Sequence, residues 1–180
     1  MNKRFTVLLL LAFALIANAK DYEFSRVEIV AQPQTDGTMR VLEKRTFDFD
    51  GEFSFAYRSF PKSDSVTFSD VKISENGTVY QSAETESPGT FRREEIDGEL
   101  KYTWYYDAED EQRTFTIEYI VDGVIKRYAD AAVLHYSFIA AEWTRPTREA
   151  RIQVNTPGNV EAPSTRAWLH GPLWGELEVR

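Results

Sequence analysis

The sequence predicts an all-β fold, an antiparallel β-sandwich that forms a single domain after a signal peptide. Three observations lead to this prediction: apolar and polar residues alternate from Tyr22 to Val179, helix-like periodicity is scarce, and Asp-Gly or Asn-Gly pairs separate the alternating segments. Alternation is typical of half-buried strands, and such pairs favour tight hairpin turns. A sheet with one apolar face must bury that face, so a second sheet is expected to cover it.

The first nineteen residues have the pattern of a signal peptide. A basic start is followed by the apolar run 5–16 and by the small residues of Ala17-Asn18-Ala19, which a signal peptidase accepts. The run is shorter than the roughly 20 residues of a membrane-spanning helix. We therefore expect export, with residues 1–19 removed and residues 20–180 forming an extracytoplasmic domain.

Tight turns order the predicted strands along the chain. Residues 27–31 and 39–41 alternate on either side of Asp36-Gly37, which predicts a first hairpin. Three more pairs predict hairpins, and together the four indicate an antiparallel meander. These pairs are Asn76-Gly77, Asp97-Gly98 and Asp122-Gly123.

The clearest strands lie in the middle of the chain, at residues 100–106 and 115–121. Each alternates strictly, so each should place one row of apolar side chains toward the core. The core-facing residues expected are Leu100, Tyr102, Trp104, Tyr106, Phe115, Ile117, Tyr119 and Val121. Residues 132–138 are interpreted as a strand after a helical turn, and residues 150–154 as a late strand. The acidic run 107–111 is interpreted as a solvated loop.

Composition limits the chemistry of the chain. It has no cysteine, which excludes disulfides and thiolate sites, so buried area must stabilise the fold, and the aromatic residues, 14% of the chain, are its main source. The formal net charge is −8, and removal of residues 1–19 would make it more negative. Basic residues cluster only in pairs, which argues against nucleic-acid binding. No cofactor is predicted.

Glu43 is the first candidate site residue. It shares strand parity with Val41 and Phe47, which would aim its carboxylate at the core. An unpaired buried charge costs several kcal/mol, so Arg45 or Arg58 should meet it. We hypothesise a structural ion pair between Glu43 and Arg58, with a ligand-binding carboxylate as the alternative.

A binding surface is the second candidate site. Trp104 and Tyr106 could stack on a sugar ring, although core packing is the alternative for both. His170 could orient a turn or face a partner. Together with Trp174, these residues form the candidate binding surface.

The sequence contains none of the common catalytic motifs that we looked for in it. The two histidines, His135 and His170, lack the spacing of a zinc site, and Gly-x-Ser-x-Gly and Gly-rich phosphate loops are missing. We therefore expect no catalytic residue and no metal ligand, and thus no enzyme. The alternative is a carbohydrate-active or metal-dependent hydrolase that uses surface carboxylates.

Several short segments together resemble a known bacterial family. They include Tyr57-Arg58-Ser59-Phe60-Pro61, Tyr136-Ser137-Phe138-Ile139, and His170-Gly171-Pro172-Leu173-Trp174-Gly175. In order and spacing they resemble the N-terminal extracytoplasmic domain of predicted membrane proteins with domain of unknown function 2207, also called YciQ-like. The resemblance implies an exported β-sandwich of uncharacterised function, normally followed by transmembrane helices.

These inferences together predict a non-catalytic binding or sensing module of the cell envelope. Its partner would be an envelope protein or a glycan. Membrane association would come only through segments beyond Arg180, if they exist. Whether the final alternating segment ends the protein or belongs to a longer, membrane-anchored one stays open at this point.

Overall fold

The computed structural model describes residues 20–139, 145–158, 164–171 and 175–179. The predicted signal peptide lies outside these residues. Within them the regular structure is strand, as the all-β prediction required, and the fold class is confirmed. This described part of the chain contains no helix with the length and apolar character needed to cross a membrane.

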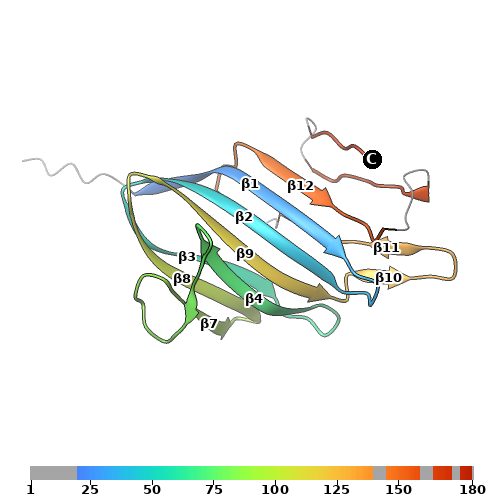
Figure 1. Cartoon of the computed structure of the whole chain (residues 1–180), viewed down its shortest axis with the longest axis horizontal. Helices are drawn as coiled ribbons and strands as arrows, with labels where there is room; N and C mark the ends of the chain where they lie inside the picture. The colour runs from blue at the N-terminus through green and yellow to red at the C-terminus, as the bar shows by residue number, and fades with distance from the viewer. Residues whose placement is uncertain (1–19, 140–144, 159–163, 172–174, 180) are drawn as a thin grey trace, which may run out of the picture.

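Two main sheets and one small sheet make up the fold (Figure 1). The six-stranded sheet has, in spatial order, β12 (Ala150–Val154), β1 (Asp21–Pro33), β2 (Met39–Asp50), β9 (Gln112–Asp122), β4 (Thr67–Glu75) and β5 (Thr78–Val79). The four-stranded sheet has β3 (Glu52–Pro61), β8 (Glu99–Glu109), β7 (Thr90–Ile96) and β6 (Gln81–Ser82). The small sheet pairs β10 (Ile125–Arg127) with β11 (Ala132–Leu134).

Two of the turns at which the chain passes from one main sheet to the other are neighbours. Gly51, with a φ of 95°, lies between β2 and β3, and Asp110, with a φ of 49°, lies between β8 and β9. The turns are held together because the Gly51 amide donates to Asp110 Oδ1 at 2.6 Å. The predicted meander is therefore wrong: β2 continues into the opposite sheet, and its second neighbour in its own sheet is β9.

Three of the four predicted hairpins are present. Asn76-Gly77 and Asp97-Gly98 have positive φ at both residues and join antiparallel strands, and the Asp36-Gly37 turn joins β1 to β2. The hairpin expected at Asp122-Gly123 is wrong. Because β2 and β4 already occupy both edges of β9, the chain cannot fold back beside it and continues into β10.

The core lies between the two main sheets and is mainly aromatic. The predicted face of β9 is fully buried, and on β8 burial extends to both faces, since Thr103 and Tyr105 on the outer face are also covered. The largest fully buried side chains include Trp104, Tyr106, Tyr119, Phe60 and Phe115. Leu100, expected in the core, is only half-buried at the end of β8.

The later part of the chain departs from the prediction in three respects. The strand at β12 exists, but it pairs in parallel with β1 and its residues are exposed. Residues 128–131 form a turn, without the expected helical conformation, and the following strand covers only residues 132–134. The acidic run 107–111 is a loop only in part, because residues 107–109 extend β8.

Candidate functional site

A carboxylate lies inside the core. Glu43 is in the middle of β2, where odd-numbered residues face the interior, and its side chain is completely buried. Arg45 donates to Glu43 Oε1 from Nη2 at 2.5 Å and from Nε at 3.2 Å. Arg58 Nε lies 3.4 Å from Glu43 Oε2. The expected Glu43–Arg58 pair is therefore present, and Arg45, the other candidate partner, makes the shorter contact.

Arg58 carries this interaction from one sheet to the other. It belongs to β3, where alternate residues from Ala56 to Phe60 face the core, whereas Glu43 belongs to β2 of the six-stranded sheet. Its Nη1 donates to the Ser59 carbonyl at 2.8 Å, and its guanidinium lies 4.8 Å from the centre of the Phe60 ring. Hydrogen bonds from its N–H groups and the Phe60 ring beside its flat face thus hold the Arg58 guanidinium in place.

Two tyrosines extend the buried polar cluster. The hydroxyl of Tyr119, on β9, lies 3.2 Å from that of Tyr136, which follows β11. Burial raises the pKa of both phenols, and the negative charge of Glu43 raises it further. Both hydroxyls therefore stay protonated at neutral pH and remain able to donate hydrogen bonds. We call Glu43, Arg45, Arg58, Tyr119 and Tyr136 the buried polar cluster.

The electrostatics keep Glu43 and Arg58 ionised. Burial by itself would raise the pKa of Glu43, but the attraction and hydrogen bonds of Arg45 and Arg58 outweigh it and hold that pKa below its ordinary value. Burial likewise opposes the charge on Arg58, and Glu43 more than compensates, so that the pKa of Arg58 is raised. A general acid or base works best with a pKa near the working pH and within reach of its substrate. Glu43 meets neither condition, so the cluster is suited to joining the sheets.

A second polar cluster, which is largely buried, lies beside β4. Arg113 Nη2 donates to Glu75 Oε2 at 2.7 Å, and the Tyr80 hydroxyl donates to the same oxygen at 2.9 Å. Arg113 Nη1 also donates to the Asp107 carbonyl at 2.7 Å and to Glu111 Oε1 at 3.0 Å. The acidic run 107–111 is therefore partly neutralised by Arg113 and serves as structural support for the crossover to β9.

The predicted binding surface is not assembled by the fold. Trp104 and Tyr106 are 0% and 1% exposed and lie in the core, so their assignment to a surface is wrong. They point inward because the six-stranded sheet covers that face of β8, where both contact Phe115. His170 is exposed and lines a hollow of about 460 Å³ within the C-terminal segment, whereas Trp174 lies outside the described residues.

A different pair of aromatic residues is exposed, on the outer face of the four-stranded sheet. Phe55 and Tyr57 of β3 are 53% and 52% exposed, and they pair with Tyr105 and Thr103 of β8, which are buried. Lys101 Nζ lies 4.3 Å from the centre of the Tyr57 ring. We call Phe55 and Tyr57 the exposed aromatic pair. Strand parity contained the signal for this pair, because an inward Arg58 requires outward neighbours.

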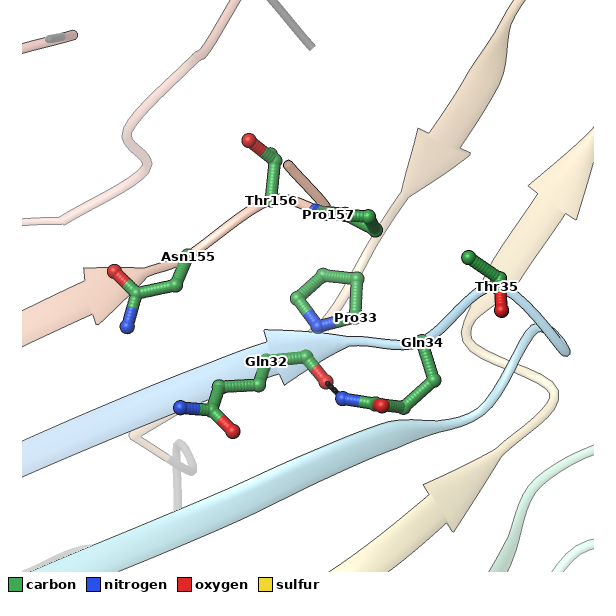
Figure 2. A pocket seen from close by; sticks show the side chains of 7 residues that line it. All are labelled: Gln32, Pro33, Gln34, Thr35, Asn155, Thr156 and Pro157. Carbon is green, nitrogen blue, oxygen red and sulfur yellow. Dashed lines mark hydrogen bonds between the residues drawn. The ribbon is translucent and has the colours of Figure 1, made fainter. Parts of the chain in front are cut away.

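A shallow depression lies at one end of β1 and β12 (Figure 2). Its volume is about 310 Å³, and it is lined by Gln32, Pro33, Gln34, Thr35, Asn155, Thr156 and Pro157. Gln34 Nε2 donates to the Gln32 carbonyl at 2.8 Å, so one of the side-chain amides that line the depression already has a hydrogen-bond partner. The lining has no ionisable side chain. The sequence offered no signal for this depression, since its two halves lie more than a hundred residues apart and come together only through the parallel pairing of β1 and β12.

Among the described residues, no group of three or more histidine, cysteine, aspartate or glutamate side chains is arranged to hold a metal ion.

Comparison with known proteins identifies one matching family. The family model described as "Predicted membrane protein (DUF2207) N-terminal domain" matches residues 23–180. The match begins just after the predicted signal peptide and covers every strand from β2 to β12 completely. No curated protein matches the chain.

A solved structure of low sequence identity is similar to the chain. The chain is similar to a crystal structure described as a "putative protease from Parabacteroides distasonis ATCC 8503", with 10% sequence identity and a TM-score of 0.39. The similarity covers 76% of this chain, and the chain spans 29% of the length of that one.

Proposed function

The chain belongs to the DUF2207 family of predicted membrane proteins, whose N-terminal domain it contains, and from this premise we propose that it is an exported, non-catalytic binding domain of the cell envelope. The exposed aromatic pair, Phe55 and Tyr57, is the observation that carries the proposal. The partner is an envelope protein or a glycan that contacts the outer face of the four-stranded sheet.

The geometry of the exposed aromatic pair favours binding. Phe55 and Tyr57 alternate with inward residues, so their side chains stand on the same face about 6–7 Å apart along the strand. Tyr105 and Thr103 lie buried beside them and support them from the neighbouring strand. Aromatic side chains held by a rigid sheet lose little conformational freedom on binding, and they often supply most of the energy of an interface.

The surroundings of Tyr57 restrict how a partner approaches. Lys101 Nζ lies 4.3 Å from the centre of its ring, so a cation already occupies one side of the aromatic system. The other side and the edge of the ring, together with Phe55, remain for the partner. Lys101 adds a positive charge beside the pair, which suits a partner with acidic or hydroxyl groups.

Site-specific photocrosslinking tests this proposal. A photoreactive amino acid at position 57 should form a discrete adduct in intact cells, and the same amino acid at position 79 should not. Val79 is the matched control, since it is also 52% exposed and lies on β5 of the other sheet. A protein adduct and a polysaccharide adduct differ in mass and in protease sensitivity, so the same gel distinguishes the two partner classes. No adduct at position 57, or the same adducts at both positions, would contradict the proposal.

A separate experiment tests the proposal that the domain is non-catalytic. The purified chain is incubated with envelope polysaccharides, with and without added divalent cations, and the release of reducing ends is measured. We expect no release above the level of a heat-denatured sample. Release that a single carboxylate substitution abolishes would establish the hydrolase alternative instead.

A further inference from the structure

The β10–β11 hairpin is a small unit at one end of the molecule. Its strands pair Ile125 with Leu134 and Lys126 with Val133, and a turn closes it through the Tyr128 amide, which donates to the Ala131 carbonyl at 2.7 Å. Ile125 and Leu134 pack against the core and anchor the base of the hairpin. The hairpin is therefore attached at its base, and its far end is free of the sandwich.

The far end of the hairpin exposes apolar and basic side chains together. Every residue from 126 to 133 is exposed, including Tyr128 at 61% and Val133 at 48%. Lys126 shares its strand pair with Val133, and Arg127 precedes Tyr128. Asp130 is the only acid between Ile125 and Leu134. An aromatic and a branched aliphatic residue beside two cations is the composition of segments that lie at a membrane surface.

The position of the hairpin agrees with such a role. Figure 1 shows β10 and β11 at the end of the molecule where the C-terminal segment, residues 164–171 and 175–179, also lies. The family description makes this domain the N-terminal part of a membrane protein, so in the family the chain leads from the C-terminal end of the domain toward the membrane part. The hairpin thus lies at the end of the domain from which the family's chain leads on to the membrane part.

We propose that the β10–β11 hairpin docks on an anionic lipid surface. Tyr128 and Val133 enter the headgroup region, and Lys126 and Arg127 contact lipid phosphates. The formal charge of the whole chain is −8, so most of its surface is repelled by anionic lipid. A basic hairpin at one end therefore also orients the domain. The inference rests on the membrane setting of the proposed function and makes no use of the exposed aromatic pair.

The absence of cysteine allows a direct test. Val133→Cys and Val79→Cys variants carry a single environment-sensitive fluorophore, and both have exposed side chains of the same type, Val133 on the hairpin and Val79 on β5. A C-terminal hexahistidine tag tethers each chain to vesicles that contain nickel-chelating lipid, which replaces the membrane part of the family by a known anchor. Besides the nickel-chelating lipid, the vesicles contain either phosphatidylcholine alone or phosphatidylcholine with phosphatidylglycerol.

We expect the fluorescence at position 133 to rise about twofold and shift to the blue on vesicles with phosphatidylglycerol, because the label enters an apolar interface. The signal at position 79 should stay unchanged. Equal responses at the two positions, or no response at position 133, overturn the proposal.

Charge reversal supplies the second readout. The Lys126→Glu/Arg127→Glu variant should lose the response at position 133, and Arg40→Glu/Lys44→Glu should keep it. The second pair lies exposed on β2 and changes the net charge by the same amount. Equal loss in both variants would assign the effect to net charge and overturn docking through the hairpin. Phe55→Ala should leave this response intact, so failure of the proposed function and failure of this inference are distinguishable.

Discussion

Glu43 of β2 and Arg58 of β3 connect the two main sheets through the core, with Arg58 Nε 3.4 Å from Glu43 Oε2 and both side chains buried. The contact links one strand of each sheet inside the core, where a charge needs a partner. Breaking it leaves an uncompensated charge in the core.

Replacing Glu43 by alanine should lower the free energy of unfolding by about 3–5 kcal/mol, since Arg45 and Arg58 then remain buried without their carboxylate. Urea unfolding followed by circular dichroism measures the change. Glu99→Ala is the matched control, because Glu99 is an exposed strand glutamate. Equal stability of the two variants would contradict a structural role for Glu43.

Stability should fall on acidification through Glu43. The arginines hold its folded-state pKa below the ordinary value of 4.5, so the unfolded chain binds the proton more readily. The stabilisation is therefore complete above pH 4.5 and is lost as the pH falls through the folded-state pKa. We expect the urea midpoint of the wild type to drop more steeply below pH 5 than that of Glu43→Gln. Parallel curves would show that other groups cause the acid sensitivity.

Gly123→Ala should be far more destabilising than Gly37→Ala. Both glycines have positive φ, 87° and 96°, and alanine costs about 1–2 kcal/mol in that conformation. A Cβ at Gly123 would also come within 1.8 Å of the Ser65 carbonyl oxygen, whereas a Cβ at Gly37 meets open space. Thermal unfolding of both variants measures the difference. Similar losses of stability in the two variants would mean that the loop before β4, which contains Ser65, moves away from the new Cβ at little cost.

Trp104→Ala should cost about 3–5 kcal/mol of stability, as expected for a large aromatic residue removed from a core. Phe55→Ala should cost less than about 1 kcal/mol because its side chain is 53% exposed. Trp104→Phe should be milder than Trp104→Ala, since the indole nitrogen has no hydrogen-bond partner to lose. Chemical denaturation of the three variants measures these losses of stability and so distinguishes the buried face of the sheet from the exposed one. A larger loss for Phe55→Ala than for Trp104→Ala would reverse the assignment of the faces.

Much of the local structure was predictable from strand parity. Parity placed Glu43 on the interior of β2 and placed Trp104 and Tyr106 on the core-facing side of β8. Their use as a binding surface was wrong because parity shows which residues share a face and does not show what covers that face. The exposed aromatic pair, Phe55 and Tyr57, was missed although an inward Arg58 places both residues on the outer side of β3.

The sequence by itself determined the sandwich class, the inward sides of β2, β8 and β9, and the turns at Asn76-Gly77 and Asp97-Gly98. These features depend on neighbours in the chain, through side-chain alternation and through residues that tolerate positive φ. Only the tertiary structure decided that β2 pairs with β9 and that β12 joins β1 in parallel. Each of these pairings joins residues that are more than about 60 positions apart in the chain, and side-chain alternation and turn residues, which act between near neighbours, do not select such distant partners.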